Sequence, residues 1–326
     1  MRLRLLALPV LLLATTSGLM TPTAATASAV TAPVYRDDVL RNARLWTDPH
    51  SPVKQAAEAR RHSDPTGAAA LDKVAGQPRT EWFGDWNPSS TVRSTVASRA
   101  AQTRAAGAVP VFVLYAVPHR DCAIGSGLDT SGYRLWVREV AAGLGAGPAA
   151  VVLEPDALGL ISCLSPAQQQ ERTGLLADAV DVLRANGKTG VYLDASSWVP
   201  ERTMAARLKA AGISRARGFS LNVSNYNTTE SEVSYGRALK GLVESKGFLV
   251  DTSRNGLGPT QDAQWCNAPG RALGRKPTTS PWISGVDALL WIKPPGESDG
   301  VCRWGEPAAG AFWPDYAIGL AQRAAW

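Results

Sequence analysis

The sequence predicts an α/β fold in which seven or eight parallel strands curl into a barrel with helices outside. Short apolar runs rich in β-branched residues alternate along the chain with alanine-rich stretches of helical length. Runs such as residues 109–115 are apolar on both faces, which is typical of a parallel strand covered on both sides. No glycine-rich dinucleotide loop follows any of these runs, so a barrel is favoured over an open doubly wound sheet.

Strands and helices alternate from residue 79 onward. We expect strands at residues 79–83, 109–115, 149–154, 190–194, 218–223, 248–251 and 288–292. We expect helices at residues 90–106, 131–144, 166–186, 200–211, 229–245 and 313–325. The residues at helix ends agree with this division, because Ser165 and Pro166 are typical of a helix start and Gly187 of a helix end.

The first 29 residues have the pattern of a secretory signal peptide. Arg2 and Arg4 precede an apolar stretch over residues 5–13, and Ala27-Ser28-Ala29 forms an A-x-A cleavage site. The apolar stretch is far shorter than the ~20 residues that a membrane-spanning helix needs. We therefore expect residues 30–326 to form a single domain that is secreted, free of the membrane and monomeric.

The charge balance gives no indication of a nucleic acid partner. The chain has 34 basic and 28 acidic residues, and removal of the signal peptide with Arg2 and Arg4 leaves 32 basic residues. These residues form no cluster, so we expect no nucleic acid binding.

The four cysteines predict two disulfides, because they are even in number in an exported chain. They are Cys122, Cys163, Cys266 and Cys302. The closest two are 36 residues apart, and the chain has only 3 histidines, so the ligand spacing of a zinc site is absent. The sequence alone permits three pairings, and we expect no metal and no cofactor.

Aspartates stand at or just beyond the carboxyl ends of five predicted strands. They are Asp121, Asp156, Asp194, Asp251 and Asp299. A single aspartate at such a place usually caps a helix or a turn. In one barrel, however, all five would share the rim where barrel enzymes place their chemistry. Burial and mutual repulsion raise the pKa of one member of such a group, which then serves as a general acid at neutral pH.

Several of the 11 tryptophans fall in loop-like or strand-end positions. They are Trp82, Trp86, Trp198, Trp265, Trp291, Trp304 and Trp313. Most tryptophans belong to cores, but Trp82, Trp198 and Trp265 lie beside strand ends and are candidates for flat platforms under sugar rings. Motifs for serine hydrolysis, phosphate binding and zinc proteolysis are absent. Aromatic faces beside carboxylates indicate a carbohydrate substrate.

Seven segments, taken together, resemble glycoside hydrolase family 6, the secreted inverting β-1,4-glucanases. The segments are Tyr115-x5-Asp121-Cys122, Leu153-Glu-Pro-Asp156, Leu193-Asp194, Leu221-Asn-Val-Ser-Asn-Tyr226, Val250-Asp-Thr-Ser-Arg-Asn-Gly256, Trp265-Cys266 and Trp291-Ile-Lys-Pro-Pro-Gly-Glu-Ser-Asp299. Their order and spacing match from about residue 45 to the C-terminus. The resemblance implies a distorted, partly open (β/α) barrel of about seven parallel strands. It also implies that this catalytic domain cleaves cellulose-type β-1,4-glucans with inversion.

The resemblance implies distinct roles for three carboxylates. Asp156 is implied as the proton donor to the glycosidic oxygen. Asp121 is implied as the neighbour that raises the pKa of the donor and helps to position or deprotonate the attacking water. Asp299 is the other candidate base, and the choice between these two stays open.

Further residues receive supporting roles from the same resemblance. Tyr115 would lie under the distorted sugar at the cleavage point, while Arg120 and Arg254 would keep Asp121 and Asp299 ionised. The implied subsite contacts are Trp82, Trp198, Trp265, Lys293, Glu297, Asp194 and Asn225. The implied disulfides are Cys122–Cys163 and Cys266–Cys302.

The loops after Asp121 and around Asp299 are short, which favours an open cleft and an endo-acting enzyme over a tunnel. An exo-acting cellobiohydrolase of the same family is the first alternative. A glucan-binding protein without activity is the second, and the retention of Asp121, Asp156 and Asp299 argues against it.

Overall fold

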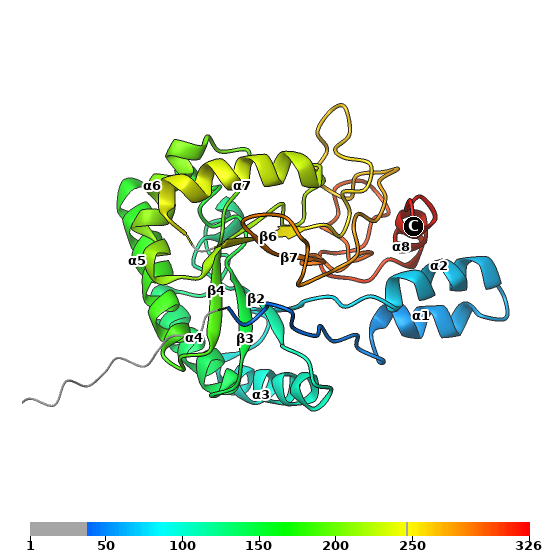
Figure 1. The fold of residues 1–326 in the computed structure, drawn as a ribbon, viewed down its shortest axis with the longest axis horizontal. Coiled ribbons are helices and arrows are strands. Elements are labelled where there is room, and N and C mark those ends of the chain that lie inside the picture. Colours follow the sequence, from blue (N-terminus) through cyan, green and yellow to red (C-terminus); the bar gives the residue numbers. More distant parts are fainter. Residues whose placement is uncertain (1–37, 246) are drawn as a thin grey trace, which may run out of the picture. The chain divides into compact units, whose positions relative to one another are not determined.

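A computed structural model describes residues 38–245 and 247–326, and these residues form a curled sheet wrapped by helices (Figure 1). The predicted signal peptide at residues 1–29 lies outside the described residues. The strands are β1 (Glu81–Gly84), β2 (Val111–Tyr115), β3 (Ala149–Leu153), β4 (Thr189–Asp194), β5 (Gly218–Leu221), β6 (Gly247–Asp251) and β7 (Val286–Leu290). All neighbours pair in parallel in the order of the sequence, as a half-barrel requires.

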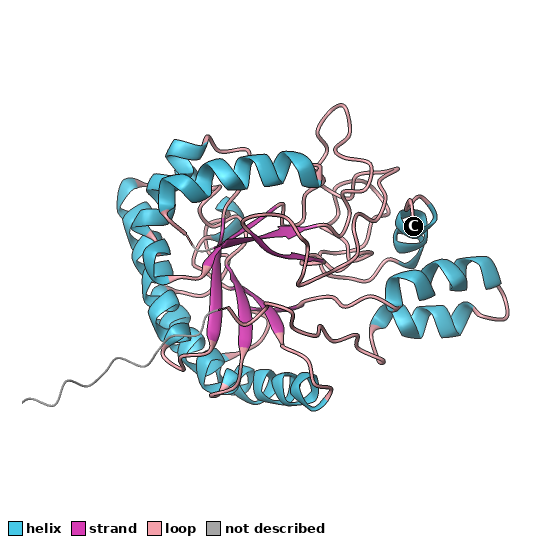
Figure 2. Cartoon of the chain, in the orientation of Figure 1, coloured by secondary structure: helices cyan, strands magenta, loops and turns pink. Residues whose placement is uncertain are grey.

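The described residues form eight helices, five of which lie between successive strands as the sequence pattern predicts. They are α1 (Pro52–Arg60), α2 (Pro65–Ala75), α3 (Ser89–Ala105), α4 (Thr130–Leu144), α5 (Pro166–Arg184), α6 (Glu201–Ala210), α7 (Thr229–Val243) and α8 (Pro314–Gln322). Figure 2 shows that α3 to α7 form an arc on the outer side of the sheet. Short 3-10 turns occur at Arg120–Cys122, Ile161–Cys163 and Ile213–Arg215.

The strands are apolar on both faces because each face packs into a different core. In β2, Phe112 and Leu114 point toward the helices, whereas Val111 and Val113 join the cluster inside the curl. The inner cluster also contains Tyr192 of β4. Burial on both faces therefore accounts for the unbroken apolar runs that predicted parallel strands.

The sheet does not close into a full barrel, which agrees with the partly open form that the family resemblance implies. The strand ladder ends at β1 on one side and at β7 on the other. Three hydrogen bonds bridge these edges. The Thr80 amide donates to Trp291 O at 3.1 Å, and both the Thr80 hydroxyl (2.6 Å) and the Trp82 indole (2.7 Å) donate to Ile292 O.

Within residues 38–80, two helices precede the first strand and were not predicted. α1 and α2 pack with α8 around Trp291, which is 1% exposed. Both helices begin with a polar residue followed by proline, and the Asp64 carboxylate caps α2 by accepting the Gly67 amide at 2.8 Å. The same pair of residue types marks Ser165 and Pro166, so the sequence did carry this signal. Among the described residues, no helix has the length and apolarity needed to cross a membrane.

Candidate active site

The carboxyl ends of the strands carry a concentration of unusual backbone conformations. Left-handed φ angles occur at non-glycine residues after strands β2, β3 and β5. They are His119, Asp121 and Cys122 after β2, Glu154 and Asp156 after β3, and Asn222 and Ser224 after β5. Each such residue costs on the order of 1–3 kcal/mol, and strain of this kind concentrates at functional sites. The rim that the sequence predicted as the site is therefore also the strained part of the sheet.

Asp121 lies in the 3-10 turn that follows β2, and the hydroxyl of Tyr115 donates a hydrogen bond to its carboxylate. Burial of Tyr115, together with the negative charge of Asp121, raises the pKa of the tyrosine, so the hydroxyl stays protonated and can donate. The Cys122–Cys163 disulfide ties this turn to the segment after β3. Asp121 itself is exposed, so it is open to substrate and to water.

The expected ion pair between Arg120 and Asp121 is wrong. The Arg120 guanidinium pairs instead with Asp85, just after β1, at 3.1 Å. It lies over the rings of Tyr115, at 4.7 Å from the centroid, and of Trp86, at 5.7 Å. Because the backbone at Asp121 is left-handed, the adjacent side chains of Arg120 and Asp121 point to different partners. The order of the residues in the sequence could not indicate this. Arg120 thus supports the Tyr115 ring rather than the Asp121 charge.

Asp156 is half-buried at the end of β3, and its amide donates to the Asp194 carboxylate at 3.0 Å. Burial raises the pKa of Asp156 well above its usual value, and the negative charges of Asp194, Asp121 and Asp299 raise it further. Asp156 therefore retains its proton at a pH where an ordinary aspartate has lost it. This is the property that a general acid requires.

Asp194 ends β4 and is 3% exposed. Its second oxygen accepts a hydrogen bond from the Ser220 hydroxyl at 2.9 Å. Burial raises the pKa of Asp194 to about 7 against the opposing effect of these two hydrogen bonds. The buried Asp194 therefore holds the backbone of Asp156 by a hydrogen bond and raises the pKa of the Asp156 carboxyl group.

Asp299 lies in the opposite electrostatic environment. Its carboxylate pairs with Arg254 at 2.8 Å and with Lys293 at 3.5 Å, and it accepts the Asn267 amide at 2.8 Å. Burial by itself would raise the pKa of Asp299, but Arg254 and Lys293 lower it below its usual value. The expected ion pair of Arg254 with Asp299 is therefore present, and Arg254 is completely buried, with its guanidinium 4.5 Å from the centre of the Tyr226 ring.

A buried pair that the sequence analysis did not assign connects the loops of Asp121 and Asp156. Glu154, 1% exposed, accepts the amides of Ala116 at 2.9 Å and Val117 at 3.1 Å from the segment after β2. Arg172 of α5, 2% exposed, donates to the carbonyls of Pro118 and Ala157. Glu154 directly precedes Pro155 at the end of an apolar run. An acidic residue at the end of a buried strand could have indicated this role from the sequence.

The expected subsite residues occupy two kinds of place. Trp82 is partly buried, packs edge-on against Tyr115 with ring centres 5.5 Å apart, and lies 5.9 Å from Lys293 Nζ. Trp198 and Trp265 are 50% and 64% exposed, so a large part of each side chain is accessible to a ligand. Polar groups complete the set. Lys293 donates to Ser298 O at 3.1 Å, Glu297 pairs with Arg79 at 3.0 Å, and Asn225 donates to Val223 O at 2.9 Å.

Asp251, the remaining strand-end aspartate, is fully occupied by backbone amides. Its carboxylate accepts hydrogen bonds from Ser224, Ser253, Ile292 and Lys293 at 2.9–3.2 Å. It joins the ends of β5, β6 and β7, so it holds the rim together and has no free oxygen to offer a substrate.

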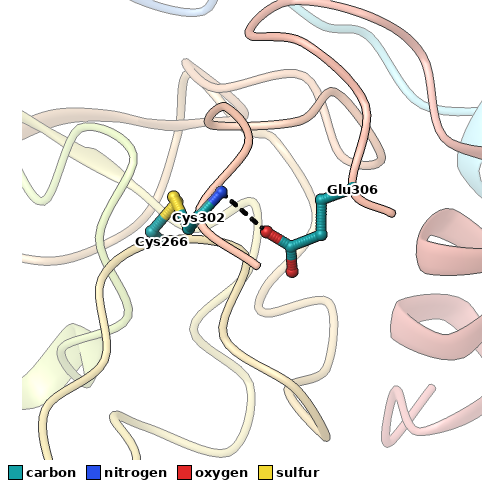
Figure 3. A group of neighbouring side chains, drawn as sticks. All are labelled: Cys266, Cys302 and Glu306. Carbon is teal, nitrogen blue, oxygen red and sulfur yellow. Dashed lines mark hydrogen bonds between the residues drawn. A yellow bond between two sulfur atoms is a disulfide. The ribbon is translucent and has the colours of Figure 1, made fainter. Parts of the chain in front are cut away.

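The loop that carries Asp299 continues into a second disulfide. Figure 3 shows Cys266 bonded to Cys302 and the Glu306 side chain accepting the Cys302 amide, at 3.0 Å. Both expected disulfide pairings are thus confirmed. Three possible metal-ligating residues meet here, but the two sulfurs are bonded to each other and Glu306 is bound to amides. The cluster is a structural anchor of the loop.

A curled parallel sheet with carboxylates at its carboxyl-end rim defines this protein as an enzyme of the barrel class. The sequence matches the family described as glycosyl hydrolases family 6 over residues 40–324, and the chain belongs to this family. The family predicted from the sequence motifs is therefore confirmed, as is a half-barrel of seven parallel strands.

Named relatives and a solved structure agree with this assignment. Endoglucanase A of Cellulomonas fimi is 41% identical over 279 residues, which cover 84% of this chain and 61% of that protein. Endoglucanase A of Thermobispora bispora is 39% identical, over 96% of this chain and 68% of that protein. The endoglucanase Cel6 from Mycobacterium tuberculosis, solved in complex with methyl-cellobiosyl-4-deoxy-4-thio-β-D-cellobioside, is similar in structure with a TM-score of 0.83. It is 46% identical, and the match covers 87% of this chain and 98% of that one.

Proposed function

We propose that this protein is a secreted, endo-acting β-1,4-glucanase that cleaves its substrate with inversion and uses Asp156 as general acid. The observation that carries the proposal is the position of Asp156, where burial and three neighbouring carboxylates together raise its pKa. The names of the relatives and the cellobioside bound by the Mycobacterium tuberculosis enzyme support the substrate class. The predicted signal peptide supports export.

In the proposed reaction, Asp156 gives its proton to the glycosidic oxygen as the bond to the leaving sugar breaks. A water attacks the opposite face of the sugar ring, as an inverting mechanism requires. The raised pKa of Asp156 keeps the proton available at neutral pH. After the reaction Asp156 is ionised, and it regains a proton from solvent before the next turnover.

We assign to Asp121 the role of the base that accepts a proton from the attacking water. Asp121 is exposed, and the Tyr115 hydroxyl fixes one of its oxygens while leaving the other available. Asp299 is less suited to this task, because Arg254 and Lys293 lower its pKa and its oxygens are engaged. We assign to Asp299 the stabilisation of the positive charge that develops on the sugar ring in the transition state.

Endo action is tested by comparing two readouts on soluble carboxymethyl-β-1,4-glucan. An endo-acting enzyme cuts within chains, so the viscosity falls steeply before many reducing ends have formed. A cellobiohydrolase would release reducing sugar with little early loss of viscosity. That second result would contradict the endo assignment while leaving the hydrolase in place.

The role of Asp156 is tested by Asp156→Asn, which keeps the shape and removes the proton to be donated. We expect turnover of unactivated glucan to fall by about 10²–10⁴-fold, which is the usual contribution of general acid catalysis. Binding of cello-oligosaccharides, measured by titration of tryptophan fluorescence, should stay within about threefold of the wild type. Wild-type turnover by this variant would contradict the assignment.

A further inference from the structure

The loop between Asp299 and α8 displays a tryptophan that none of the roles above uses. Trp304 is 102% exposed, and Val301 on the same loop is 66% exposed. An exposed tryptophan leaves a large apolar surface in water, and the rigid, amphipathic indole is a frequent anchor for a ligand.

The backbone on both sides of Trp304 is fixed. Cys302 is bonded to Cys266, and the Cα atoms of the two cysteines are 6.3 Å apart. Glu306 accepts the amide of Cys302 at 3.0 Å (Figure 3). It also accepts the amide of Arg303 at 2.9 Å, so one carboxylate joins the two ends of the turn. Trp304 is thus presented by an ordered turn, and little conformational freedom remains to be lost on binding.

The anchor of this turn is also part of the candidate active site. Asn267 exchanges two hydrogen bonds with Asp299, at 2.8 and 2.7 Å, and its carbonyl accepts the Arg303 guanidinium at 2.8 Å. Trp265, which is 64% exposed, directly precedes Cys266 and Asn267 in the chain. The chain geometry keeps the Cα atoms of Trp265 and Trp304 within about 18 Å of each other.

We propose that Trp304 forms an additional glucan-binding subsite, in which the indole stacks on a glucose ring of the β-1,4-glucan beyond the rings held at Asp299. This subsite rests on the proposed function and extends it, because it adds affinity only for chains long enough to reach the loop. The pyranose ring offers an apolar C–H face that matches the exposed indole, and the Cys266–Cys302 disulfide links the Trp304 turn to the segment that binds Asp299.

The test compares Trp304→Ala with Trp282→Ala as a matched control. Trp282 is 97% exposed, but it lies on the connection that leads into the amino end of β7, whereas Trp304 follows the carboxyl end of that strand. Kinetics are measured on cello-oligosaccharides from cellotriose to cellohexaose. Affinity for soluble β-1,4-glucan is measured separately by gel electrophoresis in glucan-containing gels, which needs no turnover.

We expect Trp304→Ala to raise KM for cellohexaose about five- to tenfold and to weaken retention in the glucan gel. Truncation of an aromatic anchor at a binding surface commonly lowers affinity by this amount. Cellotriose should be hydrolysed as by the wild type, Trp304→Phe should restore part of the affinity, and Trp282→Ala should change neither readout. Equal behaviour of the Trp304 and Trp282 variants, or equal losses at every substrate length, would overturn the subsite. If the wild type hydrolyses no oligosaccharide but Trp304→Ala alone weakens retention in the gel, the subsite stands and the proposed function fails. If the wild type neither hydrolyses nor is retained, both fail.

Discussion

At the residue scale, the surroundings of two carboxylates on one rim shift their pKa values in opposite directions. Asp156 has a pKa well above its usual value because of burial and its acidic neighbours, whereas Arg254 and Lys293 lower the pKa of Asp299 against the effect of burial. Carboxyl groups whose pKa values are separated in this way can act as acid and as permanent anion in the same site. The division of labour therefore follows from what surrounds each aspartate.

The pH dependence of activity should respond to Asp194. Its negative charge raises the pKa of Asp156, so Asp194→Asn should lower that pKa. Because Asp156 must be protonated to act, the alkaline limb of kcat should move to lower pH in this variant. The profile is measured on cellohexaose between pH 4 and 9.

A suitable control is Asp181→Asn, which changes an exposed carboxylate on α5 that pairs with Arg215. It should leave the alkaline limb in place. A limb that moves to higher pH in Asp194→Asn, or that stays where it was, would contradict the coupling of Asp194 with Asp156.

The sequence predicted the strand-end aspartates but not the partner of each one. Asp121, Asp156 and Asp299 were identifiable because the short motifs around them are specific and each follows an apolar run. Arg120 was expected to pair with the adjacent Asp121, yet it pairs with Asp85 from another strand end. Contacts of this kind depend on φ angles that residue order does not reveal.

At the element scale, the loops after β2 and β3 act as one unit because Glu154 and Arg172 join them. Glu154 binds amides after β2, and Arg172 binds carbonyls after both strands. The two loops carry Asp121 and Asp156, so this buried pair fixes the distance between them. Loss of either side chain would leave the buried amides or carbonyls that it binds without their partner.

Glu154 should leave a signature in the pH dependence of stability. Burial raises the pKa of Glu154 to about 7, against hydrogen bonds that lower it, whereas the unfolded chain has the ordinary value near 4.5. Between these two values the unfolded state releases a proton that the folded state retains, so the free energy of unfolding falls as the pH rises. The loss over this window is on the order of 3 kcal/mol for one such group.

The measurement is the free energy of unfolding in denaturant at several pH values between 4 and 8, for the wild type and for Glu154→Gln. The variant cannot ionise, so its decrease over this window should be smaller by the contribution of Glu154. Asp194, whose pKa is also raised to about 7, keeps its own contribution in both proteins. Identical slopes in the two proteins would mean that Glu154 does not titrate in this range.

Some strands and helices were easier to predict from the sequence than others. Strands β2 to β5 fell inside or close to their predicted ranges, because burial on both faces gives a continuous apolar signal. The helices α1 and α2 were missed although Ser51-Pro52 and Asp64-Pro65 carry the residue types of a helix start. They precede the first strand, so the alternation of strands and helices did not indicate them.

At the scale of the whole molecule, the half-barrel leaves the rim open and two disulfides hold the loops that complete it. Cys122–Cys163 joins segments 41 residues apart in sequence, and Cys266–Cys302 joins segments 36 residues apart. Hydrogen bonds from Thr80 and Trp82 bridge the edges β1 and β7. Loop anchoring therefore contributes to the shape of the site as much as the sheet does.

Removal of the first disulfide should affect both stability and catalysis. The double substitution Cys122→Ser with Cys163→Ser should lower the free energy of unfolding by about 4 kcal/mol, as expected for a closed loop of this length. Because Cys122 adjoins Asp121, kcat should also fall at temperatures where the variant remains folded. Denaturant unfolding and initial-rate kinetics measure the two effects, and a variant with unchanged stability and unchanged kcat would contradict this account.

The overall architecture could be predicted because strand–helix alternation and buried strands are properties of composition and spacing. Seven or eight parallel strands were inferred in this way, and the structure has seven. The incomplete closure came from the family resemblance, since no local pattern distinguishes a half-barrel from a full one. Closure depends on how the last strand meets the first, and this is decided by contacts between residues more than 200 positions apart, such as Thr80 and Ile292.

The central claim is inversion by Asp156 acting with a water on the opposite face of the sugar. It is tested most directly by following the hydrolysis of cellohexaose by proton NMR and recording the anomer of the newly formed reducing end in the first minutes. The account predicts that the α-anomer appears first and that the β-anomer grows only by later mutarotation. Initial formation of the β-anomer would show retention of configuration and would contradict the proposed mechanism.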